Sequence, residues 1–228
     1  MAGRWSLLGP VEPEPTTRAL THVESMLDRY GLLSRTIVSA EGFTGGFAAA
    51  YKVLSGLEET GAVSRAYAVE GIGGAQFALP GVIDRLRSSA ADETSRAVVL
   101  TAADPANPFG ASVPWPDRDH DGKPTRAAGA LTVLVDGSPV LWVDRGLTSL
   151  LTWPVDPDVI RIAVGALVPV LQGLAEKVAV TRIDSVAFTD VPRDAIVLQE
   201  LLSRGFAMTP RALTLRPATT ASRSFTDA

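Results

Sequence analysis

The sequence predicts an α+β protein with an N-terminal winged-helix domain, followed by an α/β domain with a partly closed antiparallel sheet or barrel. Two observations support this fold class. Residues 17–79 hold three helical patterns and then two short strand-like runs. From residue 97 on, strand pairs and helices follow one another without the regular alternation of a parallel α/β sheet.

The first domain is read from hydrophobic spacing and from residues that start or end helices. This spacing predicts three helices, at residues 17–30, 35–40 and 47–60. Thr17 and Ser34 are suitable N-caps, and Gly31 and Gly61 stand where helices commonly end. Strand-like runs at 62–69 and 75–79 flank a glycine-rich turn, which is typical of a hairpin. Three helices closed by a hairpin form the winged-helix plan, whose third helix can enter a DNA groove.

The second domain is expected to begin with a buried strand at residues 97–102. Asp136–Gly137 is a hairpin turn signal between two β-rich arms, at 130–135 and 140–143. Asp156 and Pro157 indicate the start of a long apolar helix at 157–177, which is expected to be kinked or broken at Pro169. The remaining expected elements are strands at 147–153, 178–183 and 212–216, with a helix at 192–204.

These patterns divide the chain into four parts. Residues 1–16 are rich in proline and glutamate and read as a lead-in linker. The winged-helix domain covers 17–87 and ends with a short helix at 82–86, before a polar stretch. The C-terminal α+β, barrel-like domain covers 97–217, and a tail covers 218–228.

Composition and charge limit the possible functions. At 46% hydrophobic and 20% charged residues, the chain of 228 residues is expected to fold. Its formal net charge is −4, and residues 17–87 carry seven basic and seven acidic side chains. Because phosphate neutralisation supplies most non-specific DNA affinity, we expect weak DNA binding in isolation.

Several kinds of chemistry are absent from the sequence. Without cysteine there is no disulfide and no thiolate-bound zinc. No P-loop and no G-x-S-x-G motif occurs, and segment 71–76 is expected to be a wing turn rather than a nucleotide loop. The aspartates around His120 lack the closing glutamate of a calcium loop, so no metal is expected. No apolar run approaches the roughly 20 residues of a membrane span, and the N-terminus lacks a signal-peptide core, so we expect a cytoplasmic protein without a membrane partner.

Two sets of residues stay open between a functional and a structural role. Five aspartates stand near predicted strand ends, where either a catalytic acid or a turn would use them, and a turn is favoured: Asp104, Asp136, Asp144, Asp184 and Asp190. The loop at 104–116 has four prolines and two aromatic residues. It is either a docking or base-stacking platform or a lid over a sheet edge, with the lid slightly favoured.

Four strings, in order, resemble the C-terminal region of bacterial Lhr (large helicase-related) helicases: GRWSLL at 3–8, GGFAAAY at 45–51, GGAQFALPG at 73–81 and DPANPFG at 104–110. The resemblance extends over nearly the whole chain, up to Pro217. It implies an ATP-dependent 3′-to-5′ helicase family linked to DNA repair. Since the motor motifs are missing, we expect a fragment, a split-gene product or a misassigned start, with ATP and Mg²⁺ needed only by the absent motor domains.

The first hypothesis is an accessory nucleic-acid-binding and assembly module for single-stranded or forked DNA. Its phosphate contacts are expected at Arg35, Lys52, Arg65 and Arg85, with Tyr67 as a stacking or wing contact. Its partners would be the helicase motor domains, or a separate motor subunit.

Two alternatives remain. The resemblance extends to winged-helix glycosylases that remove damaged or uracil bases, for which Asp104 is a weak candidate and no catalytic residue is assigned. The other alternative is a structural oligomerisation module that self-associates through the apolar residues of 159–174.

Overall fold

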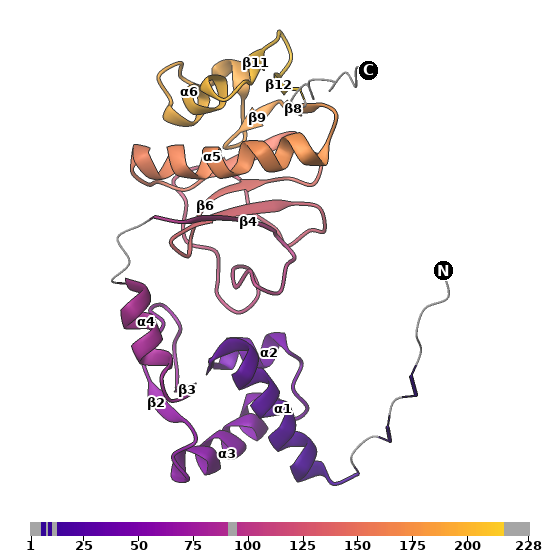
Figure 1. Cartoon of the computed structure of the whole chain (residues 1–228), viewed down its shortest axis with the longest axis vertical. Coiled ribbons are helices and arrows are strands. Elements are labelled where there is room, and N and C mark those ends of the chain that lie inside the picture. The colour runs from indigo at the N-terminus through magenta and orange to yellow at the C-terminus, as the bar shows by residue number, and fades with distance from the viewer. Residues whose placement is uncertain (1–5, 8, 11–12, 91–94, 217–228) are drawn as a thin grey trace, which may run out of the picture. The chain divides into compact units, whose positions relative to one another are not determined.

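The structure is a computed structural model that describes residues 6–7, 9–10, 13–90 and 95–216 (Figure 1). The predicted tail at 218–228 lies outside the described residues, as do parts of the predicted lead-in and of the polar stretch before residue 97. Contacts divide the chain into two compact units. Unit 1 is Met1–Asp92 with Ala111–Val113, and unit 2 is Glu93–Gly110 with Pro114–Ala228.

Unit 1 has the winged-helix order that the sequence predicted. Its elements are α1 (Pro15–Tyr30), β1 (Leu32–Leu33), α2 (Arg35–Ala40), α3 (Gly46–Glu59), β2 (Ser64–Ala66), β3 (Gln76–Ala78) and α4 (Val82–Ala90). The three strands form an antiparallel sheet in the order β1-β3-β2. Strand β1 was not predicted, because two residues carry no periodicity.

Capping residues set the helix starts in unit 1. The Ser34 hydroxyl accepts the Ile37 N–H at 3.4 Å, which confirms the predicted cap of α2. Helix α1 begins two residues earlier than predicted, because Pro15 occupies its first position and the Glu14 carboxylate accepts the Thr17 N–H at 2.5 Å.

The loop between β2 and β3, residues 67–75, is the wing, and one buried side chain shapes it. The Gln76 side-chain carbonyl accepts the N–H groups of Ala68 (3.1 Å) and Val69 (3.0 Å). Its amide donates to the carbonyls of Val69 (2.9 Å) and Ile72 (3.1 Å). All four hydrogen-bonding positions of one amide therefore hold the wing against the sheet.

Unit 2 contains two sheets. Its elements are β4 (Ala97–Thr101), β5 (Leu131–Val135), β6 (Ser138–Val143), β7 (Ser149–Thr152), α5 (Pro157–Leu174), β8 (Val178–Val180), β9 (Arg182–Ile183), β10 (Val186–Ala187), the 3-10 helix η1 (Phe188–Asp190), α6 (Ile196–Ser203), β11 (Ala207–Met208) and β12 (Leu213–Leu215). One sheet has the order β10-β9-β7-β6-β5-β4 and the other β11-β12-β8.

The expected partly closed antiparallel sheet or barrel is not what the described residues form. Strands β7 and β9 run parallel, with α5 as the crossover that such a pair requires. The predicted continuous strand at 178–183 is broken at Thr181, so that β8 pairs with β12 in the smaller sheet. The larger sheet is therefore mixed, and its outer strands, β4 and β10, are not paired with each other.

Both faces of the larger sheet are covered. Leu141, Val143 and Leu150 point into a core with α5 and α6, whereas Trp142 and Leu151 point to a second core on the opposite face. This explains why every residue of β5 is buried. Edge strand β4 has no buried residue, and Val98 is 49% exposed, so the buried strand expected there is wrong.

Trp115 of the proline-rich loop and Ala127, which follows the loop, pack against the second core. Trp115 stacks between Phe109 (5.7 Å between ring centroids) and Trp153 (5.6 Å). The Arg126 guanidinium donates to four carbonyls at 2.6–3.2 Å: that of Ala103, just before the loop, and those of Asp104, Asn107 and Phe109 within it. The loop is thus a fixed structure that packs beside the sheet.

Helix α5 is the main core helix of unit 2 and lies across the larger sheet (Figure 1). Six of its residues are buried: Ile160, Ala163, Val164, Leu167, Val168 and Leu171. It runs through Pro169 and ends at Leu174, three residues earlier than expected. Contrary to the expectation that no apolar run approaches a membrane span, its 18 residues, with mean hydropathy 1.4, are long and apolar enough to cross one. A core helix of a folded unit meets the same criterion, and the buried residues place α5 in that role.

Candidate nucleic-acid interface

A groove of about 660 Å³ lies at the start of α3, the helix that winged-helix proteins can insert into DNA. Its walls include Arg35 and Ser39 of α2, Phe47, Tyr51 and Lys52 of α3, and Ala75 at the end of the wing. We call it the α3 groove. Two of the predicted contact residues, Arg35 and Lys52, therefore share one site.

The cations of the α3 groove are available to a ligand. Arg35 and Lys52 are exposed, and no ion pair joins either one to a carboxylate in the part of the chain that the structure describes. The Arg35 guanidinium lies 5.2 Å from the centre of the Phe47 ring. Such an arginine is held in place by the ring while its N–H groups stay free for an anion.

Arg65 has a different environment. It pairs with Glu58 at 2.6 Å and lies over the rings of Tyr51 (5.7 Å) and Phe77 (5.2 Å). The hydrogen bond to Glu58 raises the pKa of Arg65. Arg65 therefore links α3 to the sheet, and it would have to leave Glu58 to contact a phosphate fully.

The two other predicted residues lie apart from the α3 groove walls. Tyr67 follows β2 at the start of the wing and is 89% exposed, which suits a stacking or backbone contact. Arg85, on α4, lines a separate groove of about 600 Å³ with Asp28, Tyr30 and Leu86. The structure thus brings Arg35 and Lys52 together and places Arg85 elsewhere.

Sequence reasoning missed the aromatic lining of the α3 groove. Phe47 and Tyr51 contribute to the hydrophobic spacing that predicted the third helix, and both pack against the core of unit 1. They are only partly buried, however, and both also line the groove. The signal that could have found them is their position one turn apart, beside Lys52.

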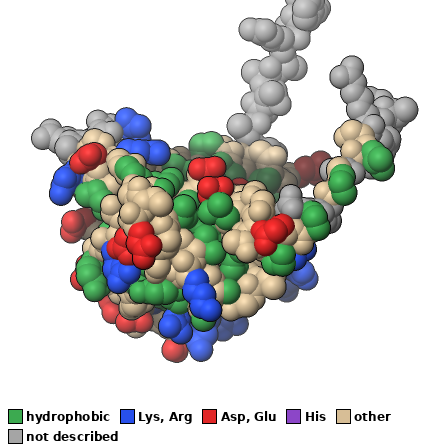
Figure 2. Space-filling view, turned by 90° about the horizontal axis from the view of Figure 1, so that it is seen from below, with side chains coloured by type: hydrophobic (Ala, Val, Ile, Leu, Met, Phe, Trp, Pro, Cys, Tyr) green, Lys and Arg blue, Asp and Glu red, His purple; other side chains and the backbone are tan. Residues whose placement is uncertain are grey.

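Charge on the molecular surface is mixed. In the face shown in Figure 2, Lys and Arg side chains are interspersed with Asp and Glu and with apolar side chains. Three arginines of unit 1 are neutralised by neighbours, through the pairs Arg29–Glu41, Arg65–Glu58 and Arg87–Asp84. Any contact with phosphate is therefore local, at grooves such as the α3 groove.

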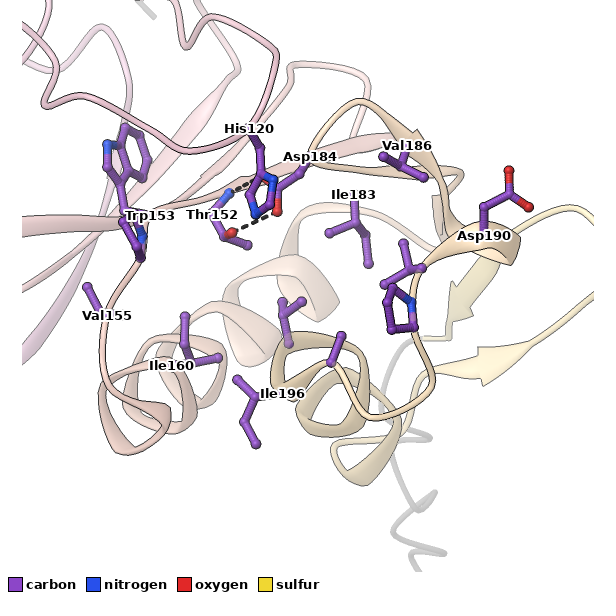
Figure 3. A pocket seen from close by; sticks show the side chains of 15 residues that line it. His120, Thr152, Trp153, Val155, Ile160, Ile183, Asp184, Val186, Asp190 and Ile196 are labelled. Atoms are coloured by element: carbon purple, nitrogen blue, oxygen red, sulfur yellow. Dashed lines mark hydrogen bonds between the residues drawn. The ribbon is translucent and has the colours of Figure 1, made fainter.

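Unit 2 has a pocket of about 400 Å³ near the end of β7 (Figure 3). Most of its wall is aliphatic, with side chains from α5, β9, β10 and α6 and from the segments at 154–155 and 191–195. Its titratable residues are His120, Asp184 and Asp190. His120 and Asp190 are exposed at the rim, whereas Asp184 is largely buried.

Asp184 is fully engaged by its neighbours. Its carboxylate accepts the Thr152 N–H and hydroxyl, each at 2.7 Å, and forms an ion pair with buried Arg118. Asp184 and Ser185 both have positive φ, 49° and 68°, and form the tight turn between β9 and β10. Asparagine and glycine are usual in such a turn, so these polar residues are explained by their side-chain bonds, including that from the Ser185 hydroxyl to Asp121.

Three other strand-end aspartates also serve local structure. Asp104 accepts the Ala106 N–H at 2.8 Å, and Asp136 accepts the Arg96 N–H at 2.8 Å. Asp144 accepts bonds from Gly146, Thr148 and Ser149. These contacts match the favoured turn interpretation. Among the described residues, no three His, Asp or Glu side chains gather as a metal site would require.

Comparison with known proteins agrees with this architecture. Residues 12–98 match the winged-helix domain of large helicase-related proteins. Over 225 residues, 95% of this chain, it is 45% identical to the Mycolicibacterium smegmatis protein named Lhr helicase/probable uracil glycosylase. Over 158 residues, 67% of this chain, it is 45% identical to the Escherichia coli Lhr helicase/uracil glycosylase.

The winged-helix unit and these matches define a class, the helicase-related winged-helix proteins. Within that class the chain belongs to the Lhr family, as the four sequence strings predicted. It corresponds to a limited region of such proteins, since it spans 15% of the mycobacterial relative and 10% of the E. coli relative.

Proposed function

We propose that this chain is an accessory nucleic-acid-binding and assembly module of an Lhr-type protein, and that it binds single-stranded or forked DNA. The observation that supports this most directly is the α3 groove. There, Arg35 and Lys52 stand beside two aromatic rings, and no carboxylate lines the walls. Cations interleaved with aromatic side chains suit a strand whose phosphates and bases are both accessible.

The exposed face of α3 suits positioning better than sequence readout. Ala48, Lys52 and Gly56 are exposed along it, and only Lys52 carries a hydrogen-bond donor on its side chain. Phosphate contacts fix the register of a protein on DNA, whereas base-edge contacts specify the sequence. We therefore expect little sequence preference.

The proposal includes helicase motor domains as the partner of this module. The relatives are much longer than this chain and are named helicases, so motor domains in the same protein or in a separate subunit are the expected partner. ATP and Mg²⁺ would be bound by those motor domains. The near-neutral balance of unit 1 supports a role in which the module guides a strand that another part of the protein grips.

Charge reversal in the α3 groove tests the proposal. For Lys52→Glu and Arg35→Glu we expect a loss of affinity for a fluorescent forked DNA, and a weaker dependence of binding on salt, measured by anisotropy titration. Arg87→Glu is the matched control, because Arg87 lies on α4 and is already paired with Asp84. Unchanged binding by both groove variants would reject the assignment.

A second candidate is base excision, and the pocket in unit 2 favours it. The two relatives carry uracil glycosylase in their names. A pocket of about 400 Å³ is within the size range of small-ligand sites, and Asp190 stands exposed at its rim. Asp184 is already bound by Thr152 and Arg118, which leaves Asp190 as the better candidate for activating water.

Abasic-site formation on a uracil-containing single strand tests this second candidate. We expect Asp190→Asn to abolish the product and Asp104→Asn to leave it unchanged, because Asp104 serves a turn outside the pocket. If neither the parent chain nor the Asp104 variant forms abasic sites, glycosylase activity is excluded in this chain.

A further inference from the structure

A second groove lies on the other side of the turn between α2 and α3. It measures about 400 Å³ and is lined by Arg18 and His22 of α1 together with Phe43 and Thr44 of the turn. We call it the α1 groove. Thr44 lines the α1 groove and the next residue, Gly45, lines the α3 groove, so the two grooves flank a single turn.

The α1 groove has two side chains that can donate hydrogen bonds, and both come from one helix. Arg18 and His22 are one helical turn apart on α1. The His22 ring packs against Phe43 with 5.0 Å between centroids and is half-buried, which restrains its orientation. An imidazole has an N–H to donate whether it is neutral or protonated.

Two carboxylates close in sequence to the groove residues, Glu14 and Glu41, are already bound to other groups. Glu14, one turn before Arg18, accepts the Thr17 N–H, and backbone hydrogen bonds lower its pKa to about 2. Glu41, just before the turn, accepts bonds from Tyr30 (2.5 Å) and Arg29 (3.2 Å). Among the residues that the structure describes, no carboxylate lines either groove and none forms an ion pair with Arg18.

The residues between the two grooves, Gly45 and Gly46, have no side chains. Gly45 and Gly46, at the start of α3, have φ values of 82° and 63°. A Cβ atom on Gly46 would meet nothing within 4 Å, so the space over this residue is open. A ligand strand can therefore approach the backbone closely here.

We propose that the α1 and α3 grooves form one continuous track for the sugar-phosphate backbone of a nucleic acid strand. Arg18 and His22 bind phosphates on one side of the turn, and Arg35 and Lys52 bind phosphates on the other. The track rests on the proposed nucleic-acid function and extends it to two residues outside the winged-helix recognition elements.

A nucleic acid strand fits this surface better than an isolated anion does. The cations are distributed over three helices on both sides of the turn, so a ligand with one charge could meet only a part of them. A phosphodiester backbone repeats its charge along the strand, and its bases can reach Phe47 and Tyr51 in the α3 groove.

The test compares five variants of the full chain on a fluorescent single-stranded oligonucleotide at several salt concentrations: Arg18→Glu, Arg18→Gln, His22→Phe, Lys52→Glu and Arg87→Glu. For Arg18→Glu we expect weaker binding. We also expect the slope of log K against log salt to shrink by about 0.7 for each phosphate that the variant no longer neutralises. His22→Phe keeps the ring on Phe43 but removes the donor, and should weaken binding less. Arg87→Glu, outside both grooves, should bind as the parent chain does.

The outcomes separate the track from the function on which it rests. If Arg18→Glu and His22→Phe bind with parental affinity and slope while Lys52→Glu binds weakly, the track is wrong and the α3 groove alone carries the binding. If Lys52→Glu also binds as the parent does, both proposals fail. Arg18→Gln is the second variant at this position, and parental affinity and slope for that variant would overturn the track even if Arg18→Glu failed to fold.

Discussion

Individual glycines in this protein are required by close neighbours rather than by loop flexibility alone. At Gly110, φ is 75° and an added Cβ would clash with the Trp115 indole nitrogen. Gly173 on α5 is the opposite case, since a Cβ there would meet nothing within 4 Å. The same substitution therefore has opposite consequences at these two positions.

We expect Gly110→Ala to lower the free energy of unfolding by about 1–3 kcal/mol, through strain and displacement of the Trp115 ring. Gly173→Ala should instead be neutral or raise it by up to about 1 kcal/mol, because alanine is the better helix former. Urea unfolding followed by tryptophan fluorescence measures both. An unperturbed Gly110→Ala protein would show that the Phe109–Trp115–Trp153 stack does not hold the loop.

At the scale of elements, the wing depends on a side chain from the strand that follows it. Gln76 is 1% exposed and bonds to three residues of the wing. For Gln76→Leu we expect a loss of about 1–3 kcal/mol in unfolding free energy, because backbone groups lose their partners. Hydrogen exchange should become faster at residues 67–74. Tyr67→Ala, at an exposed wing position, is the control and should leave this exchange unchanged.

Helix α1 has a pH-sensitive start. Hydrogen bonds from backbone N–H groups lower the pKa of Glu14 from 4.5 to about 2. A lowered pKa means that this stabilisation is fully present above about pH 4.5 and is lost as the pH falls toward 2. Glu14→Gln should therefore be less thermally stable than the parent at pH 6, and the difference should disappear near pH 2. Glu24→Gln, farther along α1, is the control for removing a carboxylate away from the helix start.

Strong local signals predicted the elements well. The Ser34 cap, the Asp136–Gly137 turn and the Pro157 helix start all stand where the sequence placed them. Strands β1, β10 and β11 were not predicted, because each is two residues long and carries no periodicity. The predicted barrel was wrong because the chain breaks at Thr181, which places β8 and β9 in different sheets.

Only a part of the candidate site could be predicted from the sequence. The winged-helix order pointed to the third helix and hence to Lys52, with Arg35 beside it. Arg18 and His22 lie on α1 at positions that helical spacing marks only as exposed or half-buried. Their place beside Thr44 depends on how α1 packs against the α2–α3 turn, which spacing does not reveal.

At the scale of the whole molecule, each hydrophobic core draws its residues from one unit. The unit 1 core includes Val23, Leu54 and Phe77, and the main unit 2 core includes Leu141, Leu167 and Leu198. Self-association was an alternative that depended on the apolar residues of α5. Most of these residues are instead buried in the main core of unit 2. Leu174, 58% exposed, is left at the end of the helix.

Separate cores predict separate responses to cavity-forming substitutions. Leu54→Ala should lower the stability of unit 1 by about 2–5 kcal/mol and leave hydrogen exchange in unit 2 unchanged, and Leu167→Ala should do the reverse. Leu174→Ala is the control and should change neither unit measurably. Slower or faster exchange spreading through both units from either core substitution would show that they unfold together.

The shape of the proline-rich loop depends on Arg126, a residue that lies outside the loop. Its planar guanidinium donates to four backbone carbonyls at once. A lysine offers one compact charge and cannot replace that guanidinium. If residues 104–116 are grafted alone into another protein, we therefore expect them to lose their conformation. If Arg126 is grafted with them, many side chains within the loop can be changed without loss of that conformation.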